Sequence, residues 1–309
     1  MIFIHSFIPW FGGKADLAMQ IVARFPPAYQ RYVEVFGGGA SVLFAFKNKE
    51  FYEVYNDIHD NVVNLFRVVK TKPLEFLSAL DLFPFESRSD FVSLKSFLKG
   101  NADYPDDFED KLYTSSDQSI ADLPDDIKEI LESKKVSPDV IKAVAYYRVI
   151  KLSYAARGKT FCCRPVNLAN VSMTIMLASN RLQSTVIENL NYDRLIKLYD
   201  RPDTFFYCDP PYFNTDADYN RTFKRQEHQK LHDLLMKIQG KFLLSYNDCP
   251  QIRSLYNSPD LMIESLSRSS NLEQKYNPGK TYSEILIANY DIDLASQSSC
   301  YGQTSLPIN

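Results

Sequence analysis

The stretch Thr204–Phe213 carries the residues best suited to chemistry, because an apolar strand runs straight into Asp209, Pro210, Pro211 and Tyr212. Two successive prolines cannot continue a central strand, since each lacks a backbone donor and has a fixed φ angle. The chain must therefore turn outward at the carboxyl end of the strand, where open α/β sheets bind ligands. There the Asp209 carboxylate and the Pro210 carbonyl could accept both hydrogens of one planar amino group, with Tyr212 stacked on its ring. This arrangement favours an aromatic amine as substrate, and the alternative is a purely structural turn.

A second candidate site is the segment Val33–Val42, in which a strand, three glycines and the start of a helix follow one another. The glycines at 37–39 lack a Cβ atom, so their backbone could approach a ligand closely. Their spacing is not that of the G-x-G-x-x-G dinucleotide motif. The next strand ends at Asp57, where a carboxylate is well placed to accept both hydroxyls of a ribose. Asp60, the competing carboxylate, is expected to cap the helix that follows it.

A third element is Pro9-Trp10-Phe-Gly-Gly-Lys14, which precedes a predicted helix. Trp10, the only tryptophan, could lie against a ligand ring, and its alternative role is that of a core residue. Lys14 could pair with a ligand carboxylate, and its alternative is a solvated charge at the start of the helix.

Together these elements resemble motifs of the D12-class, Dam-type adenine N6 methyltransferases of the α-group. Asp209-Pro-Pro-Tyr212 matches their D-P-P-Y motif, and the glycine segment resembles E-x-F-x-G-x-G. The N-terminal element resembles K-W-x-G-G-K, with Pro9 where the family often has lysine. The order of lysine element, glycine loop, insert and D-P-P-Y is that of the α-group. The resemblance covers roughly residues 5–70 and 140–290.

The resemblance implies an S-adenosyl-L-methionine-dependent enzyme that methylates the N6 amino group of adenine in double-stranded DNA, after the base has flipped out of the helix. Hydrogen bonds from N6 to Asp209 and Pro210 would localise the nitrogen lone pair, and the carboxylate would stabilise the developing positive charge. The implied catalytic residues are Asp209, Pro210, Pro211 and Tyr212. The implied cofactor-binding residues are Trp10, Lys14, Glu34, Phe36, Gly37, Gly39, Asp57 and Asp209.

The elements that must position these residues alternate between strands and helices. Enrichment in β-branched and aromatic residues predicts seven strands: Tyr32–Phe36, Phe51–Asp57, Thr185–Asn189, Thr204–Asp209, Lys241–Asn247, Leu261–Leu266 and Glu284–Tyr290. Apolar residues at 3.6-residue spacing predict helices at Lys14–Phe25, Ala40–Asn48, Asp60–Lys70, Val140–Leu152, Leu168–Arg181, Asp193–Leu198 and Gln226–Ile238. The predicted fold is a Rossmann-like seven-stranded α/β methyltransferase sheet with crossover connections.

The alternation breaks between residues 71 and 140, which are predicted to form a small, mostly helical inserted domain for target recognition. Residues 1–70 and 141–290 would then form a discontinuous catalytic domain, and 291–309 a flexible tail. Although the net charge is −3, residues 101–139 hold twelve carboxylates and four lysines, so this segment carries −8 and the remainder +5. A mildly basic body is compatible with phosphate contacts, whereas the acidic segment is unlike a DNA-reading surface.

Basic loops outside the acidic segment supply the candidate DNA contacts. They are Arg157, Lys159, Arg164, Arg221, Lys224 and Arg225. His228 and His232 are four residues apart on a predicted helix, a spacing that can bind metal. Because there is no H-E-x-x-H motif and no obvious third ligand, we expect a surface helix and no metal site.

Length and composition are those of an ordinary soluble protein, with 309 residues of which 45% are apolar. No apolar run approaches the ~20 residues that span a bilayer. The N-terminus lacks the basic flank and cleavage site of a signal peptide. Five cysteines without a C-x-x-C pair favour a reduced cytoplasmic protein. We expect double-stranded DNA as the partner, no membrane association, a monomer or weak dimer, and a role compatible with restriction–modification.

Other readings keep the fold and change the substrate to RNA adenine, the N4 amino group of cytosine in DNA, or a protein amide. The D-P-P-Y sequence favours adenine, since many cytosine-N4 enzymes have serine at the first position. A further alternative is a non-enzymatic, cofactor-binding regulator, which the presence of Lys14, Asp57, Asp209 and Tyr212 disfavours.

Overall fold

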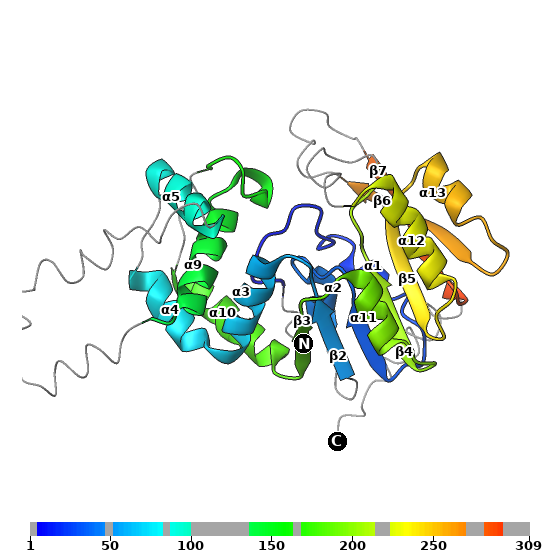
Figure 1. The fold of residues 1–309 in the computed structure, drawn as a ribbon, viewed down its shortest axis with the longest axis horizontal. Coiled ribbons are helices and arrows are strands. Elements are labelled where there is room, and N and C mark those ends of the chain that lie inside the picture. Colours follow the sequence, from blue (N-terminus) through cyan, green and yellow to red (C-terminus); the bar gives the residue numbers. More distant parts are fainter. Residues whose placement is uncertain are drawn as a thin grey trace, which may run out of the picture. The chain divides into compact units, whose positions relative to one another are not determined.

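The computed structural model describes residues 5–46, 52–82, 87–99, 136–162, 168–213, 223–269 and 281–292. These residues divide into two compact units, each described below by itself. The first unit contains the described residues within 1–6, 13–58 and 184–309, and it holds the sheet (Figure 1). The second contains those within 7–12 and 59–183 and is helical.

The first unit is built on a seven-stranded sheet of order β3-β2-β1-β4-β5-β7-β6. Its first five strands run parallel, and β7 is antiparallel to both β5 and β6. The strands are β1 (Arg31–Glu34), β2 (Tyr52–Asn56), β3 (Thr185–Glu188), β4 (Thr204–Cys208), β5 (Lys241–Asn247), β6 (Met262–Ser269) and β7 (Thr281–Ala288). All seven predicted strands are therefore confirmed, and so is the predicted Rossmann-like methyltransferase sheet. Central β4 is buried along its whole length, as expected for a strand covered on both faces.

Five short helices accompany the sheet: α1 (Ala18–Val22), α2 (Ser41–Ala45), α11 (Tyr192–Tyr199), α12 (Arg225–Leu235) and α13 (Pro250–Leu255). Four of them coincide with predicted helices, although α1 and α2 are shorter than predicted. The sequence analysis missed α13, because its six residues are too few to show a helical period. Apolar side chains of α11, α12 and α13 pack with those of β1, β4 and β5 in one core cluster.

The second unit is a group of helices around α9 (Pro138–Lys151), which packs against α3, α4 and α5. Its other helices are α3 (Asp60–Thr71), α4 (Pro73–Leu82), α5 (Arg88–Leu98), the 3-10 turn η1 (Tyr154–Ala156) and α10 (Leu168–Leu182). The buried guanidinium of Arg148 on α9 donates to the carbonyl of Leu80 at 2.8 Å. Asp60 does not cap α3 as expected, because the helix already begins at Asp60 and its N-cap is His59.

The compact helical unit is larger than the predicted insert, since α3 and α10 pack with its other helices. The assignment of residues 71–140 to target recognition stays a prediction, and the acidic residues 101–135 lie outside the described part of the chain. The predicted tail lies outside it from residue 293 onward. Among the helices that the structure describes, none combines the length and the apolar character that a membrane span requires.

Candidate active site

Asp209 directly follows β4, so its side chain lies at the carboxyl end of the central parallel strands. The ammonium of Lys14 is 2.7 Å from each of the two Asp209 carboxylate oxygens. The Lys14 side chain is only 3% exposed and that of Asp209 17%. Lys14 and Asp209 are 195 residues apart in the sequence, and the fold joins them in one ion pair. The N-terminal lysine element and the Asp-Pro-Pro-Tyr motif therefore meet in the structure. Lys14 was predicted to pair with a cofactor carboxylate, and in this structure its partner is Asp209.

A second carboxylate, Glu284 of β7, is also buried in this part of the sheet, with 3% exposure. Burial raises the pKa of Asp209 above its ordinary value, and the negative charge of Glu284 acts in the same direction. Lys14 opposes both effects, and the Ser245 hydroxyl, which donates to Asp209 at 3.3 Å, opposes them too. The cluster thus holds two carboxylates and one ammonium in a region of low polarity, where charges interact strongly.

Tyr212 is fixed at both its hydroxyl and its ring. The hydroxyl donates to a Glu284 carboxylate oxygen at 2.9 Å, and the Lys14 ammonium lies 4.6 Å from the ring centroid. Burial and the charges of Asp209 and Glu284 hold the pKa of Tyr212 far above its usual value, so the phenol stays protonated and donates. The turn after Tyr212 is anchored by the Asn247 side chain, which donates to the Phe213 carbonyl at 3.2 Å.

The glycine loop after β1 is held against β2 by three hydrogen bonds. The amide of Gly37 donates to the Asn56 carbonyl at 2.7 Å, and the amide of Gly38 donates to the Asp57 carboxylate at 2.8 Å. The Tyr55 hydroxyl donates to the Gly38 carbonyl at 2.7 Å. A Cβ atom at Gly37 would collide with the Tyr55 ring, and Gly38 has a positive φ of +48°, which glycine adopts without strain. The loop and Asp57 are therefore a single rigid assembly at the ends of β1 and β2.

The sequence of the chain is similar to those of known methyltransferases. Residues 10–273 match the model of the family described as D12 class N6 adenine-specific DNA methyltransferase. The chain belongs to this family. It is 21% identical over 266 residues to the type II methyltransferase M.CviBI of Paramecium bursaria Chlorella virus NC1A, covering 81% of this chain and 85% of the relative. It is also 34% identical over 71 residues to the modification methylase StsI of Streptococcus sanguinis, covering 23% of this chain and 11% of that protein.

The protein is thus a DNA adenine N6-methyltransferase that uses S-adenosyl-L-methionine, as the sequence motifs predicted. The donor set at the ends of β1 and β2 fits this cofactor. The Asp57 carboxylate suits ribose hydroxyls, and the glycine loop exposes backbone rather than side chains. The partly buried ring of Phe36 lies 5.6 Å from that of Tyr192 and 5.9 Å from that of Phe223, so the loop begins beside an aromatic surface.

Two other predicted cofactor residues have different surroundings. Glu34 is buried on β1, where its carboxylate accepts a hydrogen bond from the Tyr32 hydroxyl at 2.8 Å. Trp10 is half-buried in the segment 7–12, which belongs to the helical unit, and its role stays a prediction. Sequence reasoning missed Ser245 and Glu284, which are buried polar residues next to apolar runs of β5 and β7. A polar residue directly beside an apolar run was the available signal.

The predicted DNA contacts lie in both units. Arg157 and Lys159 are exposed residues of the helical unit, and Lys224 and Arg225 are exposed at the start of α12 in the methyltransferase sheet unit. Arg164 and Arg221 lie outside the described residues.

The prediction of a surface helix for His228 and His232 is wrong for His228, which is 3% exposed. Its Nδ1 atom is 2.6 Å from the Tyr246 hydroxyl, and its ring packs edge-on against Phe213 and Phe223. The apolar residues at 3.6-residue spacing turn this side of α12 toward the core, and a histidine with one polar partner fits there. Among the described residues, no group of three His, Cys, Asp or Glu side chains could hold a metal ion.

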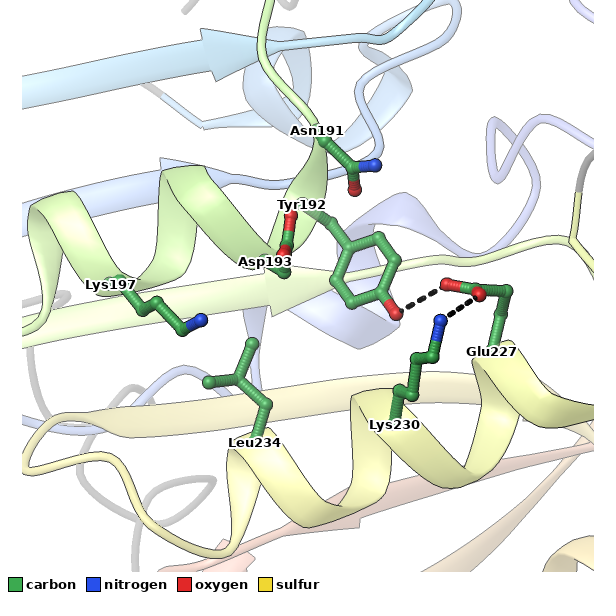
Figure 2. Close-up of a pocket in the computed structure, with 7 residues that line it drawn as sticks. All are labelled: Asn191, Tyr192, Asp193, Lys197, Glu227, Lys230 and Leu234. Atoms are coloured by element: carbon green, nitrogen blue, oxygen red, sulfur yellow. Dashed lines mark hydrogen bonds and ion pairs between the residues drawn. The ribbon is translucent and has the colours of Figure 1, made fainter.

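A separate hollow of about 420 Å³ lies between α11 and α12 (Figure 2). It is lined by Asn191, Tyr192, Asp193, Lys197, Glu227, Lys230 and Leu234. Glu227 accepts from the Tyr192 hydroxyl at 2.8 Å and from the Lys230 ammonium at 2.6 Å. None of the predicted catalytic or cofactor residues lines this hollow.

Proposed function

We propose that this methyltransferase acts on an adenine flipped out of double-stranded DNA, with Asp209, Pro210, Pro211 and Tyr212 as its catalytic residues. The observation that carries the proposal is the buried cluster at the end of β4, in which Lys14 holds both carboxylate oxygens of Asp209 at 2.7 Å. A carboxylate can accept several hydrogen bonds, so this ion pair is compatible with Asp209 also accepting an amino hydrogen. Rigid placement of the acceptor is the main contribution that the protein makes to such a transfer.

In this mechanism the Asp209 carboxylate and the Pro210 carbonyl accept the two hydrogens of the adenine amino group. Both contacts would favour a tetrahedral nitrogen with a localised lone pair. S-adenosyl-L-methionine, when bound, would supply the methyl group from its sulfonium and leave as the neutral thioether, and the amino nitrogen would lose one proton. Positive charge develops on N6 as the new bond forms, and the Asp209 carboxylate stabilises it. Lys14 lowers the pKa of Asp209 against the effect of burial and so favours the ionised carboxylate, and the Tyr212 ring stacks on the flipped base.

The glycine loop and Asp57 would hold the cofactor, with the ribose hydroxyls on the carboxylate and Phe36 against the adenine or sulfonium portion. Trp10 and Glu34 remain proposed contributors. Support for Asp57 comes from its hydrogen bond with the Gly38 amide, which fixes the carboxylate beside the loop. Because Gly37 abuts the Tyr55 ring, the loop has no room for a side chain there.

DNA phosphates would contact Arg157 and Lys159 on the helical unit, and Lys224 and Arg225 on the sheet unit, with Arg164 and Arg221 proposed from the sequence alone. Around Lys159, the Lys95 ammonium of α5 donates to its carbonyl at 2.9 Å, so a further cation lies beside the loop. Clustered cations of this kind supply the sequence-independent part of DNA affinity. We also propose the cytoplasm as the location, and a monomer or weak dimer as the active form.

Methyl transfer tests the proposal directly. The full chain is incubated with cofactor labelled in its methyl group and with unmethylated genomic DNA, the same DNA in single-stranded form, or RNA. Nucleoside analysis should then find N6-methyladenine in duplex DNA, and single-molecule sequencing of that DNA should place it at one short motif. N4-methylcytosine, or transfer to RNA alone, would overturn the proposed substrate. Equal transfer by Asp209→Ala, with unchanged folding, would overturn the proposed catalytic residue.

A further inference from the structure

Glu284 belongs to none of the motifs found in the sequence. It is nevertheless the second carboxylate of the buried group formed by Lys14, Asp209, Tyr212 and Glu284, which is the proposed catalytic cluster. It sits on β7, opposite Asn247 of β5 and Leu266 of β6 in the sheet register, and is 3% exposed. Its carboxylate accepts the Tyr212 hydroxyl at 2.9 Å, and its charge raises the pKa of Asp209. One residue therefore contacts the stacking ring and acts electrostatically on the proposed hydrogen-bond acceptor.

We propose that Glu284 is a positioning residue for methyl transfer, which orients the Tyr212 ring for stacking and sets the charge around Asp209. The inference rests on the proposed function of Asp209 and Tyr212. It adds the antiparallel strand β7 to the parts of the fold on which catalysis depends.

The orientation of Tyr212 needs such an anchor. Residues 210 and 211 are prolines that end β4, so Tyr212 follows a turn and is not held by a strand ladder. Its side chain is fixed at the hydroxyl by Glu284 and at the ring by Lys14. A hydrogen bond to an ionised acceptor is about twice as strong as a neutral one, so loss of Glu284 would free the hydroxyl end of the ring.

The hydrogen bond and the charge of Glu284 have separate effects. Its carboxylate accepts from the Tyr212 phenol, and a neutral residue could accept the same hydrogen bond. Only a negative charge at this position also raises the pKa of Asp209, which Lys14 lowers through its ion pair. Neutral replacements of a buried carboxylate are often as stable, so the charge of Glu284 can be removed without the hydrogen bond.

Three variants separate these two roles. Glu284→Gln keeps a hydrogen-bond acceptor for Tyr212 and removes the charge, Glu284→Ala removes both, and Tyr212→Phe removes the hydroxyl and keeps the ring. Glu284→Ala and Tyr212→Phe should each lower kcat/KM by roughly 10- to 100-fold, the range expected for one hydrogen bond to a charged group. The double variant should be no more than about twofold worse than Glu284→Ala, because both changes break the same contact.

A pH profile tests the charge. The titratable groups around Asp209 include Lys14, Glu284, Tyr207, Cys208, Tyr212 and Tyr246. The pKa values of the three phenols and of the thiol are raised well above the range in question. Because burial raises the pKa of Asp209, the acidic limb of kcat should lie above about pH 4, the ordinary value for aspartate. Glu284→Gln removes a neighbouring negative charge, so this limb should shift to lower pH.

The matched control is Glu264→Gln, which removes a carboxylate from β6 of the same hairpin and should leave the acidic limb unchanged. Glu264 forms an ion pair with Arg24 and does not contact the cluster residues discussed above. Circular dichroism and calorimetric titration of the cofactor establish that each variant folds and binds. A third readout is 2-aminopurine placed at the adenine that the wild-type enzyme methylates, which should be less quenched in Glu284→Ala because stacking is looser.

The outcomes distinguish a failure of the proposed function from a failure of the positioning role of Glu284. If the wild-type protein transfers no methyl group to DNA adenine, the proposed function fails. If the wild type methylates adenine but Glu284→Ala matches it in kcat/KM, the positioning role is wrong. An acidic limb that stays in place in Glu284→Gln would overturn the electrostatic role, whatever the effect on Tyr212.

Discussion

Two clusters of the sheet unit contain tyrosine, lysine and carboxylate side chains at similar distances. They differ in their burial and in how far apart the paired residues lie in the sequence. In the proposed catalytic cluster, Tyr212 donates to Glu284 at 2.9 Å and Lys14 pairs with Asp209 at 2.7 Å. In the hollow between α11 and α12, Tyr192 donates to Glu227 at 2.8 Å, and Lys230 pairs with that carboxylate at 2.6 Å (Figure 2). The Lys14 side chain is 3% exposed and that of Lys230 64%.

The carboxylates of the two clusters have pKa shifts in opposite directions because they differ in burial. Desolvation raises the pKa of Asp209 despite its ion pair, whereas the hydrogen bond from Lys230 is the largest effect on Glu227 and lowers its pKa. Lys230 is also local to its partner, three residues along one helix, while Lys14 reaches Asp209 across the fold. Residue types alone therefore do not mark a reactive site. Burial at the carboxyl end of parallel strands is what distinguishes the proposed catalytic cluster from the hollow.

Alanine substitutions of Asp209 and Glu227 should give the largest difference in kcat between the two clusters. Asp209→Ala removes the proposed acceptor of the amino hydrogens and the group that stabilises charge on N6, so kcat should fall roughly 100- to 1,000-fold, as on losing an oxyanion-hole donor. Glu227→Ala should leave kcat within about twofold. Single-turnover methylation of duplex DNA at saturating cofactor measures both. A comparable loss in both variants would mean that the hollow takes part in catalysis.

The two lysines should differ in stability. Lys14→Met leaves Asp209 buried without its countercharge, and breaking a buried pair in this way costs about 3–5 kcal/mol at neutral pH. Lys230→Met breaks an exposed pair, which contributes less than about 1 kcal/mol. Urea unfolding followed by circular dichroism gives both free energies. The Lys14→Met deficit should shrink toward low pH, where Asp209 becomes protonated, and a pH-independent deficit would assign it to packing instead.

His228 tests how α12 separates the two clusters, since its ring faces Tyr246 on one side while Glu227 and Lys230 line the hollow. Burial lowers the pKa of His228 from 6.5 to about 4. Because the unfolded chain binds the proton more readily, this residue contributes stability above pH 6.5 that is lost as pH falls toward 4, on the order of 1–3 kcal/mol. His228→Gln should flatten the decline in melting temperature between these pH values. A decline of the same steepness in the variant would show that other groups cause it.

The sequence predicted the scaffold better than the contacts at the site. Strands such as β4 and β5 contain the apolar runs 205–208 and 242–244, so their positions follow from local pattern. Asp57 follows β2 and Asp209 follows β4, as predicted, and both lie at one edge of the sheet because parallel strands share their carboxyl edge. What the pattern lacks is pairing between distant segments. Glu284 was visible only as the first residue of a predicted strand, and its contact with Tyr212 depends on β7 lying beside β5.

The prediction for His228 was wrong for the same reason, because the burial of this side chain depends on how the chain folds around it. A histidine within a polar helix pattern indicated a surface, yet its burial depends on Phe213 and Phe223, which pack against it. The pairing of Lys14 with Asp209 was also not foreseen, since the family resemblance assigned each of them to a ligand. Both side chains were predicted to bind a ligand, and in the structure they bind each other.

DNA binding should give the smallest effect and extends the comparison to the surface of α12. Lys224 and Arg225 are exposed at the start of this helix, while Lys230 and Lys197 line the hollow. If Lys224 and Arg225 each neutralise one phosphate, alanine at both should reduce the slope of log affinity against log salt by about 2. Alanine at Lys197 and Lys230 removes the same charge and should leave the slope unchanged. Fluorescence anisotropy of a labelled duplex over a salt series measures this. Equal slopes in the two double variants would mean that Lys224 and Arg225 contribute only through the net charge of the protein. A larger loss in the Lys197 and Lys230 variant would make the hollow part of the DNA surface.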